Sequence, residues 1–449
     1  MELSAEQRER YSRQISLPGF GEAGQSRLLG SRVLVAGGDS AAHVAIHYLA
    51  GAGVGTIGIL ARGDVWGRLS GKLAAVNPDV EIVVHHAPFQ EPDLRELIGH
   101  HDVALVTGDE DGTAGVLWEA ACERTKHVAA CFVEGEGVWV SVQVSSSTNR
   151  QLPFEIKQGV SAPFVAHGIG GCLLAGEAMK SVVGLGSADM PRTVRFSMAD
   201  LSFRDGHDAR EPRGDEPVGS PETADLTAAR LLVVGAGGLG CAATMHLAAA
   251  GVGTIGIVDG DILELSNLHR QILYNTDQIS ERKAGLAKEA LCEMNSEVKV
   301  EPHEERVTEA NATELVRDYD IVLACVDNFP TRYVLNYACV SLGKPLVEAA
   351  VFEYAGQTIT FLPPETSCYR CLFESAPPGG AELPGVFGPV AGLFGTLQAA
   401  QAIKLLTGGT GCPTGKLTMF DMLDAQWHRV PIRKRDDCPS CGSSRSETG

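Results

Sequence analysis

The chain has 449 residues, enough for two or three domains with hydrophobic cores of their own. Its formal net charge of −19 disfavours nucleic-acid or anionic-membrane partners, because their phosphate groups would be repelled. The sequence has no long uncharged apolar run and no apolar signal segment at the amino terminus, so we expect a cytoplasmic protein without a membrane span. In such a protein, 12 cysteines favour metal ligands over disulfides.

The first predicted unit begins at Arg32, where RVLVAGGDSAAHVAIHYLAGAG reads as an apolar strand, a tight turn and a helix. The stretch LAGAGVGTIGIL, residues 49–60, then leads into a second strand. A strand, a turn, a helix and a second strand are the start of a βαβ unit.

The same unit occurs a second time from Arg230, as RLLVVGAGGLGCAATMHLAAAG. Residues 247–258 match residues 49–60 at ten of twelve positions. The offset between the copies is 198 residues here but 218 residues from His101 onward, so the first copy is 20 residues shorter between Ala61 and Asn77. The repeat predicts an α/β protein made of two tandem Rossmann-like domains.

The segment between the copies is rich in glycine, proline and acidic residues and lacks hydrophobic periodicity. It predicts a flexible linker, with an ordered surface loop as the alternative. We therefore expect a first domain over residues 1–204, a linker over 205–227 and a second domain over 228–449.

The glycine turn of the second copy, GAGGLG, follows a predicted strand and opens a predicted helix. It places Gly235, Gly237 and Gly240 in the pattern G-x-G-x-x-G, with Gly238 beside them. Glycines allow a tight turn and a close approach of the backbone to phosphates, whose charge is met by the amides of the helix N-terminus. Asp259, at the end of the next strand, is suited to ribose hydroxyls. A dinucleotide-dependent oxidoreductase would show the same features.

A cluster of polar and basic residues follows the ribose acid: Asn267, Arg270, Gln271 and Lys283. A nicotinamide dinucleotide needs few cations, whereas triphosphate chemistry needs several to neutralise the charge on the leaving pyrophosphate. The cluster therefore favours ATP over a dinucleotide, although each basic residue alone could be a solvated surface charge.

Asp327, in the stretch CVDN, ends another predicted strand, and Asn328 follows it. A single carboxylate there suits a Mg²⁺ ion that bridges phosphates, and we assign Asn328 to the same nucleotide site. The alternative for Asp327 is a turn or a helix cap.

Two C-x-x-C pairs complete the second copy, and they supply four thiolates: Cys368, Cys371, Cys438 and Cys441. Four thiolates are enough for a tetrahedral Zn²⁺ ion, which would fasten the carboxyl-terminal tail to the middle of the domain. The alternatives are incidental pairs or a redox dithiol.

In combination, the glycine turn, the ribose acid, NLHRQ with a downstream lysine, DN and the paired C-x-x-C knuckles resemble the ThiF/MoeB/HesA adenylyltransferases. These are bacterial relatives of ubiquitin-activating enzymes, and the likeness covers about residues 228–442. It implies ATP-dependent adenylylation of the C-terminal carboxylate of a protein or peptide. It also implies that Asp259 binds ribose, that Asn267, Arg270 and Lys283 contact phosphates, that Asp327 binds Mg²⁺ and that the four cysteines bind structural zinc.

The first copy has lost these features. Asp39 stands in place of Gly237, Ala42 in place of Gly240 and Ala61 in place of the ribose acid; Asp109 is retained opposite Asp327. A carboxylate and a Cβ at the turn would repel ATP and obstruct its phosphates, so we expect this copy to be inactive toward ATP.

The resemblance also implies that the two copies pack as an internal pseudo-dimer. RYSRQ near the amino terminus is similar to the family's opening segment, whose second arginine reaches the partner's ATP site. That residue is Arg13 here, and an arginine supplied in this way stabilises the transition state of phosphoryl transfer. The alternative is a solvent-facing helix charge.

Many relatives carry a cysteine in the loop after the first knuckle, which here has Gly380 and Ala381 at that place. Cys412 falls in the wrong segment, and Cys325 and Cys339 read as core positions. We therefore expect the acyl-adenylate to pass directly to an external nucleophile, without an enzyme thioester.

Four functions are compatible with the sequence to different degrees. The favoured one is activation of a ubiquitin-like sulfur carrier, with a sulfurtransferase as a further partner. The main alternative is a peptide-modifying adenylyltransferase of a natural-product pathway, acting on a precursor peptide. The arginine–lysine segment and the knuckles argue against an oxidoreductase, and the intact second site argues against a non-catalytic scaffold.

Overall fold

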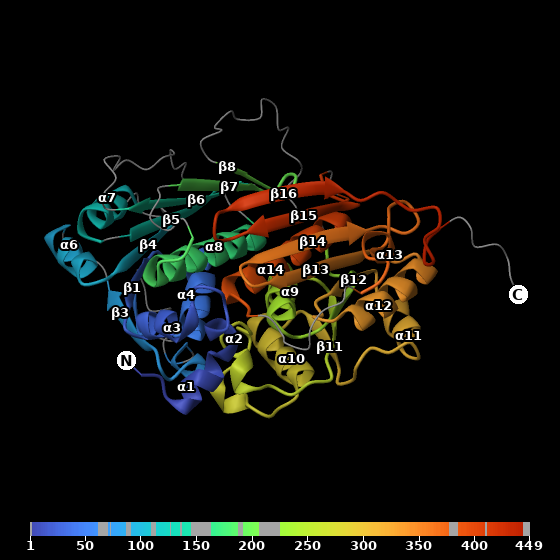
Figure 1. The fold of residues 1–449 in the computed structure, drawn as a ribbon, viewed down its shortest axis with the longest axis horizontal. Helices are drawn as coiled ribbons and strands as arrows, with labels where there is room; N and C mark the ends of the chain where they lie inside the picture. The colour runs from blue at the N-terminus through green and yellow to red at the C-terminus, as the bar shows by residue number, and fades with distance from the viewer. Residues whose placement is uncertain are drawn as a thin grey trace, which may run out of the picture.

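The computed structural model describes residues 2–61, 71, 73–86, 91–108, 114–125, 127–134, 137–144, 163–186, 192–205, 225–376, 385–408 and 411–442. They form an α/β protein with two eight-stranded sheets, one from each half of the chain. In Figure 1 the first half lies on the left and the second half on the right. The expectation of an α/β fold built on two sheets is therefore confirmed.

The first half contains the following elements: α1 (Ala5–Arg10), α2 (Ser12–Ile15), α3 (Gly21–Leu29), β1 (Arg32–Ala36), α4 (Ser40–Ala52), β2 (Thr56–Ala61), β3 (Glu81–His86), α6 (Glu91–Gly99), β4 (Val103–Thr107), α7 (Ala114–Arg124), β5 (His127–Glu134), β6 (Gly137–Val144), α8 (Phe164–Val183), β7 (Arg192–Ser197) and β8 (Ser202–Asp205).

The second half contains β9 (Arg230–Val234), α9 (Gly238–Ala249), β10 (Thr254–Val258), the 3₁₀ helices η2 (Leu265–Asn267) and η3 (Thr276–Gln278), α10 (Lys283–Met294), β11 (Lys299–His303), α11 (Ala312–Arg317), β12 (Ile321–Ala324), α12 (Phe329–Leu342), β13 (Leu346–Phe352), β14 (Ala355–Phe361), α13 (Tyr369–Leu372), α14 (Gly388–Leu406), β15 (Lys416–Asp421) and β16 (Gln426–Pro431).

The two sheets have the same strand order. The first runs β3-β2-β1-β4-β5-β6-β7-β8 and the second runs β11-β10-β9-β12-β13-β14-β15-β16. In each sheet the first five strands are parallel and the last three antiparallel. Central strands such as β4 and β12 are buried along their whole length and are apolar except for Thr107, as expected for parallel strands covered on both faces.

A matched hydrogen bond supports the alignment of the halves on both sides of the shorter segment. Asn77 Nδ2 donates to the carbonyl oxygen of Ala50 at 2.7 Å, and Asn295 Nδ2 donates to that of Ala248 at 2.8 Å. The asparagines are 218 residues apart and the alanines 198 residues apart. The 20 extra residues of the second half therefore lie between the end of β10 and Asn295, where the sequence places the basic cluster.

Helices α8 and α14 pack against each other where the halves meet, at the centre of Figure 1. Each long helix also presents a glycine to a ring from the opposite half. A Cβ on Gly168 would lie 1.9 Å from His246 Nε2, and a Cβ on Gly392 would lie 2.3 Å from the hydroxyl of Tyr48. One hydrophobic cluster of buried residues includes side chains of both halves. The halves thus share this largest cluster, and each half has a smaller cluster of its own among the described residues.

The expected linker lies mostly outside the described residues, which omit residues 206–224. At its carboxyl end, Leu226 is buried and its carbonyl oxygen accepts hydrogen bonds from the amides of Ala229 and Gly253. These last residues are therefore an ordered part of the second half. None of the described helices is long and apolar enough to cross a lipid bilayer.

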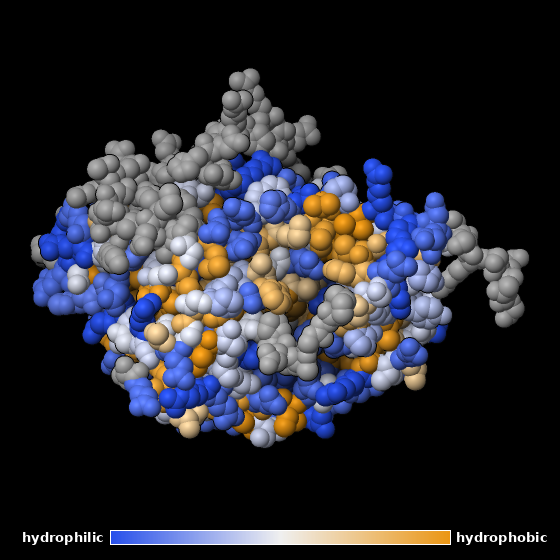
Figure 2. All heavy atoms as spheres, in the orientation of Figure 1, coloured by the Kyte–Doolittle hydropathy of each residue, from blue (hydrophilic) through white to orange (hydrophobic). Residues whose placement is uncertain are grey.

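The antiparallel end of the second sheet carries a groove of about 400 Å³ over strands β13–β16. Its lining includes Val351, Phe352 and Met419, and Phe352 is 59% exposed. Figure 2 shows hydrophobic residues, in orange, on the face over β14 and β15. An exposed aromatic residue beside an apolar groove is typical of a surface that binds a partner.

Candidate active site

The glycine turn between β9 and α9 requires glycine at two positions. Gly235 has a positive φ of 99°, and a Cβ there would lie 2.6 Å from the carbonyl oxygen of Cys325. A Cβ on Gly240 would lie 1.8 Å from the carbonyl oxygen of Gly235. Helix α9 begins at Gly238 with Gly237 as its N-cap, which has no side chain to cap the helix. The first amides of α9 can therefore bind an anion such as phosphate.

The corresponding turn of the first half supplies its own anion. Asp39 is the N-cap of α4, and its Oδ1 accepts a hydrogen bond from the amide of Ala42 at 3.0 Å. Asp39 and Ala42 occupy the positions of Gly237 and Gly240. The carboxylate thus caps the helix N-terminus that is left without a side-chain cap in the second half. Asp109 lies outside the described residues.

Asp259 lies at the end of β10 and is oriented by backbone amides. Its Oδ2 accepts from the amide of Ala236 at 2.7 Å, and its Oδ1 from the amide of Asp261 at 2.8 Å. Burial raises the pKa of Asp259, while the two amides and the nearby charge of Lys283 oppose the rise. Lys283 is buried and is the first residue of α10. The carboxylate, the lysine and the glycine turn therefore lie in one neighbourhood.

Asn267 and Gln271 are buried, and Gln271 lies beside the glycine turn. The Nε2 atom of Gln271 lies 3.6 Å from where a Cβ on Gly237 would be. Its Oε1 atom is buried and has no hydrogen-bond partner among the described residues. A buried amide oxygen without a partner is costly, so its position suits a ligand that donates to it.

Arg270 is held by two acceptors. Its Nη1 donates to the carbonyl oxygen of Ser266 at 2.9 Å and lies 2.8 Å from Nε2 of His269. Burial lowers the pKa of His269 well below its usual value, so the ring is neutral and Nε2 can accept from the guanidinium. The sequence analysis did not single out His269; the only signal was its place inside NLHRQ.

Asp327 lies just beyond β12 and is exposed, and it is electrostatically coupled to two arginines. Burial lowers the pKa of Arg270 to about 10; the charge of Arg13 adds to the shift, and the carboxylate of Asp327 opposes it. Burial also lowers the pKa of Arg13, and Asp327 again opposes the shift. The three charges therefore share one site. Asn328 caps α12, because its Oδ1 accepts from the amide of Thr331 at 3.0 Å.

Arg13 reaches this site from the first half, on helix α2. Its carbonyl oxygen accepts from the amide of Val386 at 2.9 Å, which pairs the amino-terminal segment with the second half. Nearby, Tyr354 donates its hydroxyl to the carbonyl oxygen of Pro18 at 2.8 Å. The amino-terminal segment is thus attached directly beside the charges of Arg270 and Asp327.

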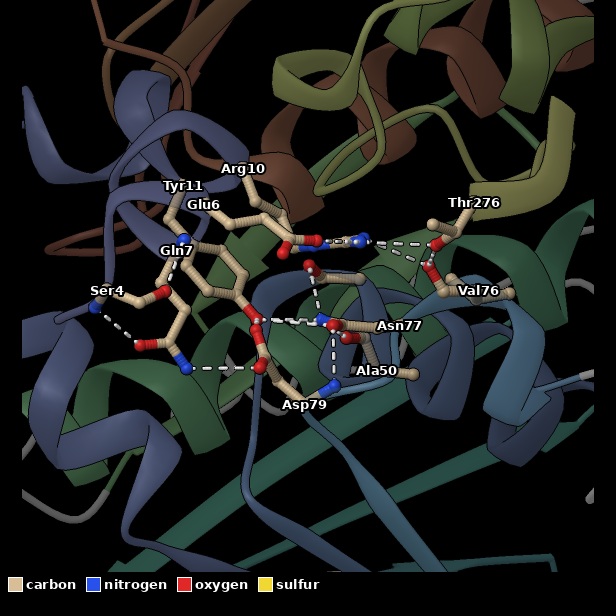
Figure 3. Close-up of polar contacts among 11 residues, drawn as sticks. Ser4, Glu6, Gln7, Arg10, Tyr11, Ala50, Val76, Asn77, Asp79 and Thr276 are labelled. Atoms are coloured by element: carbon tan, nitrogen blue, oxygen red, sulfur yellow. Dashed lines mark hydrogen bonds and ion pairs between the residues drawn. The ribbon is translucent and has the colours of Figure 1, made fainter. Parts of the chain in front are cut away.

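Hydrogen bonds of Arg10 and Tyr11 hold the amino-terminal segment in place as well, as Figure 3 shows. Tyr11 donates its hydroxyl to Oδ2 of Asp79 at 2.9 Å and accepts from Nδ2 of Asn77 at 2.9 Å. Arg10 is buried, and its Nη2 donates to the hydroxyl of Thr276 in η3 at 3.2 Å. The helix turn before Arg13 is therefore bonded to both halves.

The four knuckle cysteines converge. Their sulfur atoms all lie within 4.8 Å of one another, with Cys368–Cys438 at 3.6 Å, Cys371–Cys441 at 3.4 Å and Cys368–Cys371 at 4.0 Å. Zinc–sulfur bonds of about 2.3 Å in a tetrahedron place sulfurs about 3.8 Å apart. The thiols therefore fit a zinc ion and are too far apart for disulfides.

The other cysteines considered above are poorly suited to catalysis. Cys325 and Cys339 are buried, and burial raises the pKa of both thiols. Burial also raises the pKa of Cys412, to about 11, so little thiolate forms at neutral pH. Gly380 and Ala381 lie outside the described residues.

Comparison with known proteins gives consistent matches. The family model described as ThiF family matches residues 210–440. A sulfur carrier protein adenylyltransferase of Thermus thermophilus is 44% identical over 241 residues, which cover 51% of this chain and 88% of that protein. The sulfur carrier protein ThiS adenylyltransferase of Escherichia coli is 40% identical over 225 residues, covering 49% of this chain and 89% of that protein.

Similarity to solved structures is weaker. The crystal structure of Escherichia coli MccB is 24% identical, with a TM-score of 0.46, and the match covers 50% of this chain and 68% of that one.

Proposed function

Since the chain belongs to the ThiF family and is an adenylyltransferase, we propose that it activates the C-terminal carboxylate of a small ubiquitin-like sulfur-carrier protein. The observation that carries the proposal is that Arg270 lies against Gly238 at the uncapped N-terminus of α9. The charges of Arg13 and Asp327 act on the same guanidinium. An acyl-adenylate and pyrophosphate are the products. The names of the relatives support a sulfur carrier as the substrate.

We assign the nucleotide to the second half, with residues 228–449 as the active domain. The amides of the turn at Gly235, Gly237, Gly238 and Gly240 bind phosphate, and Asp259 binds the ribose. Asn267, Gln271 and Asn328 complete the nucleotide site, in which Gln271 contributes the buried oxygen that lacks a partner. Arg270 and Lys283 neutralise the phosphates.

We assign residues 1–204 to a degenerate domain that does not bind ATP and residues 205–227 to the linker. The two domains form an internal pseudo-dimer, supported by the common strand order and the shared core. The contribution of the degenerate domain to the reaction is Arg13, an arginine finger directed at the ATP site of the second domain.

Two metal ions are proposed for this chain. Asp327 would hold Mg²⁺, which when bound neutralises charge on the phosphates. The thiols of Cys368, Cys371, Cys438 and Cys441 would hold a structural Zn²⁺ that fastens the tail beyond β16 to the start of α13, and their sulfur–sulfur distances fit this ion.

In the reaction, a carboxylate oxygen of the partner attacks the α-phosphorus of ATP, and the bond from that phosphorus to the bridging oxygen of pyrophosphate breaks. No general base is needed, because a carboxylate is ionised at neutral pH. Arg13, Arg270 and Lys283 position the phosphates and neutralise the charge that develops on them. An external nucleophile, such as a persulfide on a sulfurtransferase, then attacks the acyl carbon, and AMP leaves.

The groove over β13–β16 is where we place the body of the carrier. It ends at the β13–β14 hairpin, where the amide of Glu353 donates to the carbonyl oxygen of Gly385 at 3.2 Å. The next residue, Val386, pairs with Arg13. A protein docked over Phe352 would therefore have its tail directed toward the finger and the phosphates.

The test is ATP–pyrophosphate exchange with the zinc-loaded chain and Mg²⁺, in the presence of Gly-Gly-ended carriers or of short peptides. We expect a carrier to stimulate exchange and the Asp327→Ala variant to lose it. Exchange with peptides alone would instead assign a peptide-modifying enzyme. ATP binding without exchange in the presence of any acceptor would contradict the proposed activity.

A further inference from the structure

A buried ion pair lies behind the Asp327 loop. Arg332 of α12 is 5% exposed and Glu348 of β13 is 1% exposed, and the Nη1 atom of Arg332 donates to Oε2 of Glu348. Removing two charges from water costs several kcal/mol per ion, and a well-packed apolar pair is often as stable. Stability alone therefore does not explain why this buried ion pair is present.

Arg332 fixes the backbone next to Asp327. Its Nη2 atom donates to the carbonyl oxygens of Val326 and, at 2.8 Å, of Ala349. Val326 directly precedes Asp327, and Asn328, on the other side, is fixed by its cap of α12. Asp327 itself is exposed, so its neighbours on either side determine where its carboxylate is placed.

The first half provides an internal comparison. Strand register pairs Ala324 with Glu348 in the second sheet and, at the same offset of 218, Val106 with Ala130 in the first. By the same offset, Ala114 stands in place of Arg332.

Both alanines of the first half are buried, and that half has the same strand order without the ion pair. The fold therefore does not require Arg332 and Glu348. Both residues are present in the half whose glycine turn is open to phosphate, and both are replaced in the half whose turn is filled by Asp39.

We propose that Arg332 and Glu348 are positioning residues of the adenylylation site: through the Val326 carbonyl they hold Asp327 in place for Mg²⁺ and the triphosphate. Glu348 orients the guanidinium, and the guanidinium holds the end of β12. The inference rests on the proposed function, because it assigns Mg²⁺–ATP to this site.

The test is calorimetric ATP binding to the whole chain with and without Mg²⁺, alongside thermal unfolding. The double variant Arg332→Ala with Glu348→Ala reproduces the side chains of the first half and should fold. Residues that orient metal ligands typically contribute about 10–100-fold in metal affinity. We expect the gain in ATP affinity on adding Mg²⁺ to fall at least about tenfold, with little change in affinity when Mg²⁺ is absent.

Two further variants make the result specific. Arg332→Lys keeps a charge opposite Glu348, but a single ammonium lacks the planar fork that bonds Glu348 through one nitrogen and the two carbonyls through the other. We therefore expect an intermediate loss. Arg230→Ala with Glu301→Ala removes a 2.9 Å ion pair between the first residue of β9 and the middle of β11 and should leave the Mg²⁺ effect unchanged.

Wild-type dependence on Mg²⁺ in both the double variant and Arg332→Lys would overturn the inference and leave the pair a structural role. If the double variant does not fold, the effect of Mg²⁺ on ATP binding to Arg332→Lys is the test of the inference. Absence of ATP binding by the unmodified chain would refute the proposed function itself, and the inference with it, which distinguishes the two failures.

Discussion

A single residue distinguishes the helix N-terminus after the glycine turn in the two halves. At one position of the glycine turn the second half has Gly237, which leaves the α9 amides open, and the first half has Asp39, which caps α4. The same helix terminus therefore either binds an external anion or is satisfied internally. The Asp39 carboxylate accepts a hydrogen bond from the amide of Ala42, so this end of α4 is capped without an external anion.

Replacing Asp39 with Ala should cost stability and spare activity. Loss of an N-cap carboxylate typically costs about 1 kcal/mol, so we expect a destabilisation of that size in denaturant unfolding. ATP–pyrophosphate exchange should stay within a factor of two or so, as no nucleotide is bound there. A large fall in exchange in a variant that remains folded would show that the first half takes part in nucleotide binding.

We expect His269 to affect activity through its contact with Arg270. The His269→Ala variant removes one of the two acceptors that hold the Arg270 guanidinium, and a hydrogen bond to a charged group is worth about 1.5–3 kcal/mol. We expect kcat/KM for ATP to fall about tenfold or more in the exchange assay. An unchanged value would mean that the Ser266 carbonyl alone orients the arginine.

At the scale of elements, α8 and α14 depend on small residues where rings from the opposite half meet them. Gly168 and Gly392 are 224 residues apart and make equivalent contacts, one with His246 and the other with Tyr48. Both rings are fully buried, so neither can move aside without disturbing the shared core.

The variants Gly168→Ala and Gly392→Ala should each destabilise the chain by about 1–3 kcal/mol, the usual cost of overpacking a core. Gly115→Ala in α7 is the matched control, because a Cβ there meets no atom within 4 Å. Alanine should be neutral or slightly stabilising at that position. Thermal unfolding of all three variants is the measurement, and equal midpoints would contradict the packing described for the helix pair.

At the scale of the whole molecule, the shared core predicts that the halves unfold together and that acid weakens both. Burial lowers the pKa of His246 to about 4 and that of His269 well below its usual value. In the unfolded chain both titrate near 6.5, so protons bind the unfolded state first as pH falls. The stability that depends on these two neutral histidines is fully present above about pH 6.5, and it is lost as pH falls toward 4.

We therefore expect the free energy of unfolding to fall by about 1.4 kcal/mol per pH unit for each such histidine between pH 6 and 5. His246→Asn should reduce this slope and leave one unfolding transition. Urea titrations across this pH range provide the measurement. A flat profile, or two separate transitions, would contradict a single core containing neutral histidines.

Much of this architecture could be predicted from the sequence, because the repeat defines both sheets and the two offsets locate the 20-residue difference. The glycine turn and Asp259 lie at the ends of the strands that the sequence predicts, and the sulfur atoms of the four knuckle cysteines lie together. The Arg332–Glu348 pair could not be found in this way. Its members lie on different elements, and only the strand register and the comparison with Ala114 and Ala130 identify them.

The assignment of Asn328 illustrates a second limit. The sequence placed a helix cap among the alternatives for Asp327, and the structure gives the cap to the neighbouring Asn328. Asp327 and Asn328 are both residue types that cap helices, and sequence propensity alone does not resolve which of two neighbours does so.

The central claim, that one chain holds one ATP site completed by an arginine of its own other half, is tested most directly by mixing two inactive variants. Arg13→Ala and Asp327→Asn should each lose roughly 100-fold or more in carrier-stimulated ATP–pyrophosphate exchange. Because Arg13 acts within the chain, a mixture of the two variants should stay as inactive as either alone. Recovery of exchange on mixing would show instead that the arginine completes a site on a second molecule.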